Sequence, residues 1–180
     1  CGAGKIALHI VKNNIIEGVD ISKKMIDLCN KEFVANNIDK SKYSFRSGNL
    51  FELDLKKESY DGIIALGFLE YQNDENKSLE FLYNLLKPSG YLILSGPNNL
   101  RLYNYFNLVT LVEKFRQKLS LNKKLDYQVD WESICLHKYS VSRFKKILLK
   151  NNFEFIDHKE YAYAGLRYIN KLIGVKAQFF

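Results

Sequence analysis

The chain has 180 residues, enough for one ordinary domain with a sizeable core. A hydrophobic content of 47% and an aromatic content of 14% exclude a disordered chain, and no apolar run reaches membrane-spanning length. The net charge of +7 is uneven, because residues 1–100 carry 12 Lys and Arg against 13 Asp and Glu, whereas residues 101–180 carry 15 against 7. The basic half could attract acidic substrates, anionic membrane or nucleic acid, but a solvated lysine-rich surface is the simpler explanation.

Three cysteines, Cys1, Cys29 and Cys135, are scattered along the chain and lack Cys-x-x-Cys spacing. Their odd number argues against a disulfide framework and fits a reducing cytosol, so we expect a cytoplasmic protein. The sequence predicts no metal site.

The first twenty residues predict a nucleoside-binding half of an α/β sheet. Residues 1–4 contain a Gly-x-Gly turn, where the backbone can approach a ligand closely. Residues 5–12 then predict a helix with one apolar face, made by Ile6, Ala7, Ile10 and Val11. Residues 15–19 predict a strand, and Asp20 at its carboxyl end could accept hydrogen bonds from ribose hydroxyls. Such a turn also fits a dinucleotide-binding fingerprint, so this stretch alone is ambiguous.

Residues 23–36 predict an amphipathic helix capped by Ser22 and ended by the Asn36-Asn37 pair. Its apolar positions are Met25, Ile26, Leu28, Cys29 and Phe33. Met25 is expected in the core, although the first turn of this helix could also touch a base. A short strand is predicted over residues 43–47, followed by Gly48-Asn49-Leu50.

A continuous apolar run over residues 63–66 is typical of a strand covered on both faces. The next helix is predicted to begin at Asn73 or Asp74 and to end before Pro88. Its apolar face comprises Leu79, Leu82, Tyr83 and Leu86. The turn Ser89-Gly90 then leads into a strand over residues 91–95.

With a strand expected before the first turn, the order is β-α-β-α-β-loop-β-α-β. This order predicts a Rossmann-like, doubly wound, mostly parallel sheet with right-handed crossovers. Ligands bind such sheets outside the carboxyl ends of the strands. Four segments fall at those ends: Gly2–Gly4, Asp20, Asn49–Leu50 and Leu66–Tyr71.

The second half of the chain is less regular. Residues 102–119 predict a long apolar helix that closes the sheet, covers an apolar substrate as a lid, or docks on a membrane surface. Residues 121–136, with the only tryptophan, support no prediction. A short helix is expected up to Lys150, with Val141, Phe144, Ile147 and Leu148 on one face. A strand is expected over residues 153–156, and residues 175–180 could begin another.

Five motifs in this order resemble the class I S-adenosylmethionine-dependent methyltransferases, with a UbiE-like domain. They are Cys1-Gly2-Ala3-Gly4, Gly18-Val19-Asp20-Ile21-Ser22, Gly48-Asn49-Leu50, the segment from Tyr60-Asp61-Gly62-Ile63-Ile64 through Leu69-Glu70-Tyr71, and the segment from Leu86 to Leu94. The resemblance covers residues 1–97 well and residues 139–156 loosely. It implies one domain over residues 1–180, with a cofactor-binding part (1–97), a lid or acceptor region (98–140) and a carboxyl-terminal helix with strands (141–180).

The resemblance also implies roles for matching residues. Gly2 and Gly4, with Cys1 and Ala3 in the same turn, would approach the methionine part of the cofactor. Asp20 would hold the ribose hydroxyls, with Ile21 and Met25 beside the nucleoside. Asn49 would contact the adenine amino group while Leu50 packs on the ring, and Leu66 and Gly67 would line the sulfonium pocket.

Two residues depart from the family's pattern. Asn49 replaces a usual aspartate, and Tyr71 stands where many relatives have histidine. The first strand of the family, which lies mid-sheet, precedes the Gly-x-Gly turn. We therefore expect this chain to be an N-terminally truncated piece of a longer protein, and to be poorly stable alone.

The predicted function is methyl transfer from S-adenosylmethionine to a small molecule or lipid. No Asn/Asp-Pro-Pro-aromatic motif follows Ala65-Leu66, so a nucleic-acid acceptor is not favoured. Peripheral membrane contact remains open, and the sequence does not indicate an oligomeric state. His137 is the candidate general base, although a surface or packing role is the simpler interpretation of this histidine. The alternatives are a catalytically inactive methyltransferase-fold binding protein and a nicotinamide-dependent oxidoreductase.

Overall fold

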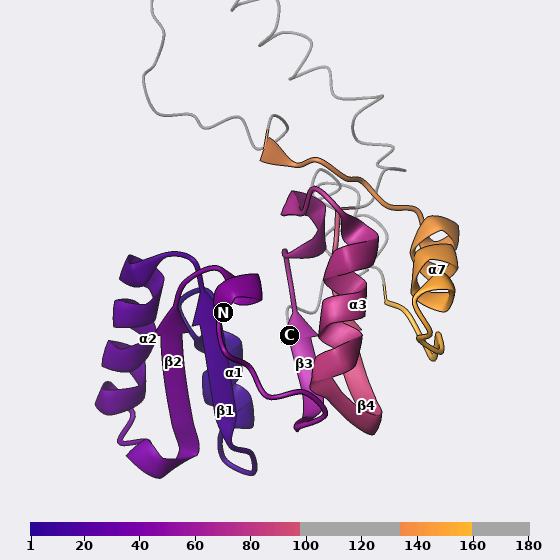
Figure 1. The fold of residues 1–180 in the computed structure, drawn as a ribbon. Helices are drawn as coiled ribbons and strands as arrows, with labels where there is room; N and C mark the ends of the chain where they lie inside the picture. Colours follow the sequence, from indigo (N-terminus) through magenta and orange to yellow (C-terminus); the bar gives the residue numbers. More distant parts are fainter. Residues whose placement is uncertain (98–133, 160–180) are drawn as a thin grey trace, which may run out of the picture. The chain divides into compact units, whose positions relative to one another are not determined.

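The structure, a computed structural model, describes residues 1–97 and 134–159 (Figure 1). It divides into two compact units. The first unit comprises residues 1–65 and 84–91, and the second comprises residues 66–83 and the chain from residue 92 onward. The predicted helix over residues 102–119 and the final strand over residues 175–180 lie outside the described residues.

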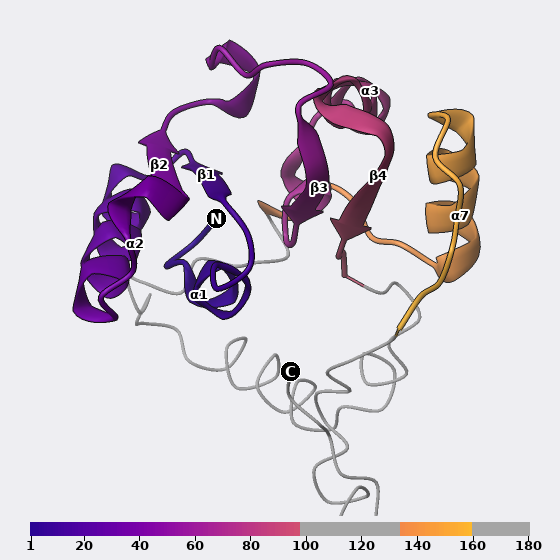
Figure 2. The same cartoon turned by 90° about the horizontal axis from the view of Figure 1, so that it is seen from below.

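The first unit follows the predicted alternation of helices and strands. Its elements are α1 (Lys5–Ile10), β1 (Ile16–Asp20), α2 (Lys23–Ala35), β2 (Tyr43–Ser47) and β3 (Tyr60–Ala65), with 3-10 turns at Lys40–Lys42 and Leu50–Glu52. β1 and β2 pair in parallel, with Ile16 opposite Tyr43 and Asp20 opposite Ser47. Figures 1 and 2 both show α2 alongside β2. Because parallel strands end at the same edge of a sheet, the segments after β1 and β2 meet there.

An aromatic cluster forms the core of the first unit. Val11, Phe33 and Tyr43 are buried, and the Phe33 ring centroid lies 4.7 Å from that of Tyr43. Partly buried neighbours complete the cluster: Ala7, Leu8, Ile16, Ile38 and Phe45. The predicted apolar face of α1 was therefore wrong in part. Leu8 joins Ala7 and Val11 against Phe33, whereas Ile6 is 47% exposed.

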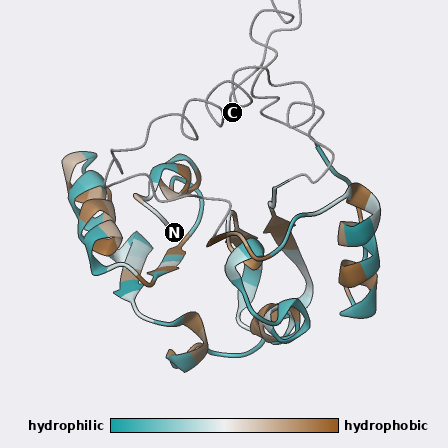
Figure 3. Cartoon of the chain, turned by 90° about the horizontal axis from the view of Figure 1, so that it is seen from above, coloured by the Kyte–Doolittle hydropathy of each residue, from teal (hydrophilic) through white to brown (hydrophobic). Residues whose placement is uncertain are grey.

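Helix α2 begins and ends as predicted but buries a slightly different stripe. Ser22 Oγ accepts a hydrogen bond from the Met25 amide at 3.4 Å, and Asn37 adopts a left-handed φ of 53° after the last turn. The buried positions are Ile26, Cys29 and Phe33. Met25 is 36% exposed, so its expected place in the core was wrong, because the buried stripe runs through Ile26 and leaves Met25 at its edge. The mixed polarity of α2 is visible in Figure 3.

A polar network supports the start of β3 in the first unit. The Tyr60 hydroxyl donates to the Glu17 carboxylate, which also pairs with Arg46. Burial, together with the Glu17 charge, raises the pKa of Tyr60 to about 12. The hydroxyl therefore keeps its proton at neutral pH and remains a donor to Glu17.

The remaining elements are a 3-10 turn at Leu69–Tyr71, α3 (Glu75–Leu85), β4 (Leu86–Leu94) and α7 (Val141–Lys150). Asp74 caps α3, since its Oδ1 accepts from the amides of Asn76 and Lys77 at 3.0 and 3.1 Å. β4 pairs with β3 in a second two-stranded sheet and begins directly after α3. The strand predicted over residues 91–95 therefore begins earlier, although Ser89 has a left-handed φ of 64° at the predicted turn. The amides of residues 58 and 59 bond to the carbonyls of residues 84 and 85, so sheet-like pairing starts at the end of the helix.

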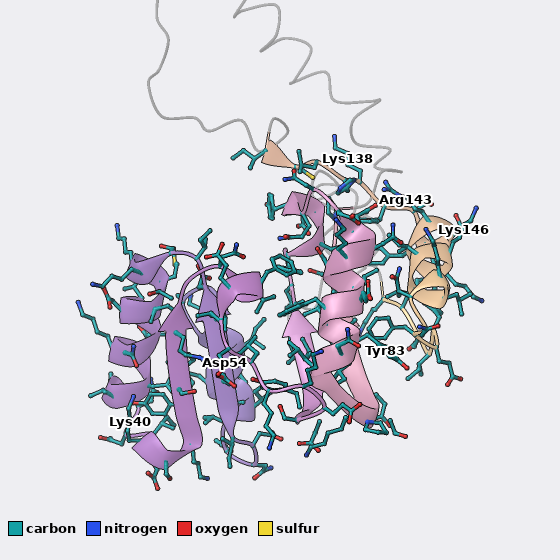
Figure 4. All side chains as sticks on the ribbon, viewed as in Figure 1. Lys40, Asp54, Tyr83, Lys138, Arg143 and Lys146 are labelled. Carbon is teal, nitrogen blue, oxygen red and sulfur yellow. The ribbon has the colours of Figure 1, made fainter. Side chains whose placement is uncertain are left out.

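In the second unit, α7 covers a core made by Leu69, Leu79 and Tyr139. Its packed residues, Phe144, Ile147 and Leu148, confirm most of the predicted apolar face. Ser140 caps α7 by accepting from the Arg143 amide at 3.2 Å. Residues 153–156 do not form the predicted strand. Phe153 instead packs edge-on against Tyr83, which Figure 4 shows beside the segment after α7.

The predicted covering of β3 on both faces is also not observed. Ile64 is 41% exposed, so within the described residues only one side of this strand is packed. The apolar run indicated a strand but not what would cover it. Within the described residues, no helix is long and apolar enough to cross a membrane.

Candidate cofactor site

The glycine turn of the first unit has the backbone geometry that the sequence predicted. Gly2 and Gly4 have left-handed φ angles of 55° and 77°, and the Gly4 amide bonds to the Cys1 carbonyl at 3.3 Å. A Cβ on Gly4 would lie 2.9 Å from the Cys29 sulfur, whereas a Cβ on Gly2 would meet no atom within 4 Å. Gly4 is therefore required by both conformation and packing, and Gly2 borders open space.

Asp20, at the end of β1, holds this turn in place. Its Oδ2 accepts from the Gly2 amide at 2.8 Å and lies 3.1 Å from the Cys1 nitrogen. Its Oδ1 accepts from the Ser22 amide at 2.9 Å. A carboxylate offers about four lone-pair sites, so Oδ1 keeps one for a further donor.

The electrostatics of Asp20 favour its ionised form. Burial alone would raise the pKa of Asp20, but the hydrogen bonds from the Ser22 and Gly2 amides lower it. A carboxylate held in this way remains charged at neutral pH and can accept hydrogen bonds from hydroxyl groups.

The segment after β2 lies next to Asp20. The Gly48 amide bonds to the Asp20 carbonyl at 3.0 Å. Asn49 is exposed, with its Oδ1 accepting from the Phe51 amide and its Nδ2 donating to Glu52. The side-chain oxygen Oδ1 of Asn49 keeps a second lone pair, which can accept a hydrogen bond from a ligand. The apolar side chains of this edge are partly or largely exposed: Ile21, Met25 and Leu50.

The structure thus brings together the predicted residues of the first unit: Cys1, Gly2, Ala3, Gly4, Asp20, Ile21, Met25, Asn49 and Leu50. Leu66 and Gly67 belong to the second unit. Gly67 has a left-handed φ of 60°, and its amide donates to Ser95 Oγ at 3.0 Å. The turn after β3 is therefore held by a residue from the end of β4, which sequence reasoning did not single out.

His137 is tied into a charged cluster of the second unit. Its Nε2 lies 2.9 Å from the Gln72 carbonyl oxygen, so this nitrogen carries the proton. Its Nδ1 lies 3.8 Å from Glu75 Oε1, and Arg143 donates to Glu75 Oε2 at 2.8 Å. A general base would have to act through Nδ1, which already faces a carboxylate.

Glu70 is a second residue that sequence reasoning missed. It is 7% exposed, and one of its carboxylate oxygens has no hydrogen-bond partner in the described part of the chain. Burial raises the pKa of this carboxyl group. Glu70 lies in the Leu69-Glu70-Tyr71 segment of the fourth motif, but no sequence pattern predicts that its carboxylate is buried.

Comparison with known proteins identifies the family. A family model described as a methyltransferase domain matches residues 1–162. The chain belongs to this family and has the Rossmann-like fold of class I S-adenosylmethionine-dependent methyltransferases. The resemblance drawn from the five motifs is thus confirmed.

Individual relatives agree with this assignment. The chain is 30% identical to a demethylmenaquinone methyltransferase from Lactobacillus johnsonii over 86% of its length, and 27% identical to the ubiquinone/menaquinone biosynthesis C-methyltransferase UbiE from Wigglesworthia glossinidia brevipalpis over 83%. It spans 65% and 60% of those two relatives. A solved SAM-dependent methyltransferase from Methanosarcina mazei superimposes with a TM-score of 0.63 at 22% identity, covering 88% of this chain and 78% of that one.

Proposed function

We propose that this chain binds S-adenosylmethionine at the glycine turn of the first unit and serves methyl transfer to a small-molecule or lipid acceptor. The observation that carries the proposal is the ionised Asp20 carboxylate, bonded to the Gly2 amide at 2.8 Å and left with one free lone pair. Membership of a methyltransferase family supports the same cofactor.

The residues of the first unit fit this cofactor. Asp20 offers a charged acceptor for ribose hydroxyls, and the exposed Asn49 amide offers an acceptor for the adenine amino group. Ile21, which is 82% exposed next to Asp20, provides apolar surface for the nucleoside. The open space beside Gly2 leaves room for the methionine part. Asn49 keeps the acceptor that the family's aspartate would supply, but without its charge.

Bound S-adenosylmethionine supplies an activated methyl group, so the protein mainly has to orient donor and acceptor. Asp20 orients the donor because it links the turn to the end of β1. His137 Nε2 donates to the Gln72 carbonyl and its Nδ1 faces the Glu75 carboxylate, which supports a positioning role for the ring rather than proton abstraction.

The acceptor that we infer is a quinone-like lipid. The names of two relatives, which refer to menaquinone and ubiquinone, support this class. The basic excess of residues 101–180 is compatible with contact to an anionic membrane, where such an acceptor would reside.

The test is release of S-adenosylhomocysteine when the protein is incubated with S-adenosylmethionine and a short-chain demethylmenaquinone. We expect release with the parent protein and with Asp39→Ala, and none with Asp20→Ala. Asp39 is a matched control, since it also accepts a backbone amide, from Ser41 at 2.9 Å, but lies away from the turn. Cofactor binding without release on a broad acceptor panel would favour a non-catalytic binding protein. Fluorescence transfer to bound reduced nicotinamide, with no S-adenosylmethionine binding, would favour an oxidoreductase.

A further inference from the structure

Two cysteine sulfurs lie against each other beneath the glycine turn. Cys1 Sγ is 3.7 Å from Cys29 Sγ, and the Cys29 thiol donates to the Gly2 carbonyl at 2.9 Å. Cys29 is fully buried on α2, whereas Cys1 belongs to the glycine turn, where Gly2 borders open space. Cys135 belongs to the second unit. The first unit thus holds a thiol of the glycine turn directly against a buried thiol.

We propose that Cys1 and Cys29 form a modification site, a reversible disulfide that switches the cofactor turn off under oxidising conditions. The disulfide itself follows from the geometry of the two thiols alone. Its effect on the cofactor rests on the proposed function.

The oxidant is a hydroperoxide, and the chemistry has two steps. The Cys1 thiolate attacks one peroxide oxygen, the O–O bond breaks, and Cys1 becomes a sulfenic acid while the leaving oxygen departs as water or an alcohol. The Cys29 sulfur then attacks the Cys1 sulfur, the S–O bond breaks, and water leaves as the S–S bond forms. Two thiols are oxidised and one peroxide is reduced. Burial raises the pKa of the Cys29 thiol, so Cys29 stays protonated and does not compete with Cys1 for the peroxide.

Closing the bond must move the turn. The sulfurs have to approach from 3.7 Å to about 2.05 Å. Cys29 is held in the buried stripe of α2 between Ile26 and Phe33, whereas Gly2 and Gly4 give the turn backbone freedom. The Cys29 thiol also loses its proton and with it the bond to the Gly2 carbonyl. The backbone that meets the cofactor is therefore the part that shifts.

The first readout is covalent. The purified protein is treated with hydrogen peroxide, blocked, digested with trypsin and analysed by mass spectrometry. We expect the peptide that ends at Lys5 to be linked to the peptide of residues 25–31, lighter than the two together by two hydrogens. The link should be reversed by dithiothreitol, absent in Cys29→Ser and unchanged in Cys135→Ser. Over-oxidation of Cys1 without this link would overturn the proposal.

The second readout is calorimetric titration of S-adenosylhomocysteine. We expect at least about tenfold weaker binding to the cross-linked protein, restored by dithiothreitol, and the same loss and recovery in Cys135→Ser. Because coupling is reciprocal, S-adenosylhomocysteine should protect the thiols from cross-linking. Equal affinity of the oxidised and reduced forms would refute the switch. No binding to the reduced parent would instead refute the proposed function, while the covalent readout would still decide whether the disulfide forms.

Discussion

The Asp20 site of the first unit and the charged cluster around Glu75 in the second unit hold their charged groups in different ways. In the first unit, the Asp20 carboxylate is met by amides two and eighteen residues away, and its pKa is lowered. In the second unit, a carboxylate, an imidazole and a guanidinium meet from segments as far as 68 residues apart. Among the described residues of the second unit, three buried polar atoms make no hydrogen bond: Glu70 Oε2, Glu75 Oε1 and Tyr139 Oη.

The Asp20 site is thus built mainly by backbone amides, whereas the charged cluster around Glu75 is built by side chains. Backbone amides hold a charge at low entropic cost, because secondary structure has already placed them. The side-chain cluster has spare hydrogen-bonding capacity and one carboxyl group, Glu70, whose pKa is raised. We therefore expect substitution of Asp20 to weaken cofactor binding, and substitutions in the charged cluster around Glu75 to lower mainly the stability of the protein.

The largest expected effect is loss of the aromatic core of the first unit. Phe33→Ala should lower the free energy of unfolding by about 3–5 kcal/mol, because it empties a fully buried site between Tyr43 and Phe45. Urea denaturation followed by circular dichroism measures the change. The neighbouring Val34→Ala is the control, since Val34 is 67% exposed and should cost less than about 0.5 kcal/mol. Equal effects of the two substitutions would contradict the assigned core.

A smaller effect is expected from the ion pair of the second cluster. Arg143→Ala should destabilise the protein by about 1 kcal/mol, because Glu75 is largely buried but Arg143 is 43% exposed. Figure 4 shows Lys146 pointing away from α7, so Lys146→Ala is the matched control on the same helix. A loss of stability with Lys146→Ala as large as with Arg143→Ala would mean that the helix, and not the ion pair, is responsible.

His137 tests whether the second cluster also does chemistry. His137→Gln should reduce methyl transfer by less than about threefold, since glutamine can still donate to the Gln72 carbonyl and a general base contributes about 100-fold or more. The rate of methyl transfer is measured as a function of pH, from about pH 6 to about pH 9. A loss of about 100-fold that also removes the pH dependence would make His137 the base.

The smallest effect concerns Glu70 and has a defined sign. Burial raises its pKa above the ordinary value of 4.5, so the folded protein holds this proton more tightly than the unfolded chain does. Its contribution to stability is complete below the unfolded pKa and is lost as pH rises through the folded pKa. The free energy of unfolding of Glu70→Gln, relative to that of the parent, should therefore be higher at neutral pH than at acidic pH. Parallel stability curves for the two proteins would show that Glu70 ionises freely.

Local signals in the sequence predicted where two helices begin. Ser22 and Asp74 cap α2 and α3 as expected, because a cap depends on residues within one turn. The side that a helix buries was less predictable. Periodicity gave α2 an apolar stripe, but the neighbours that cover Ile26 and leave Met25 exposed come from other elements.

The start of β4 and the cysteine pair illustrate why the rest could not be predicted. β4 begins at Leu86 because amides from before β3 reach the end of α3, and no local pattern encodes that pairing. Asp20 was placed near the turn because parallel strands share an edge. The hydrogen bond from the Cys29 thiol to the Gly2 carbonyl depends on the packing of α2 against the turn, and no sequence pattern predicts that packing.

The central claim is that Asp20 organises a cofactor site from the backbone of the first unit. The most direct test is calorimetric titration of S-adenosylhomocysteine into the parent protein, Asp20→Ala and Asp39→Ala. Losing a charged acceptor that also holds the Gly2 and Ser22 amides should weaken binding by about 100-fold or more in Asp20→Ala, with Asp39→Ala unchanged. Parent-like affinity in Asp20→Ala, or an equal loss in both variants, would contradict the account.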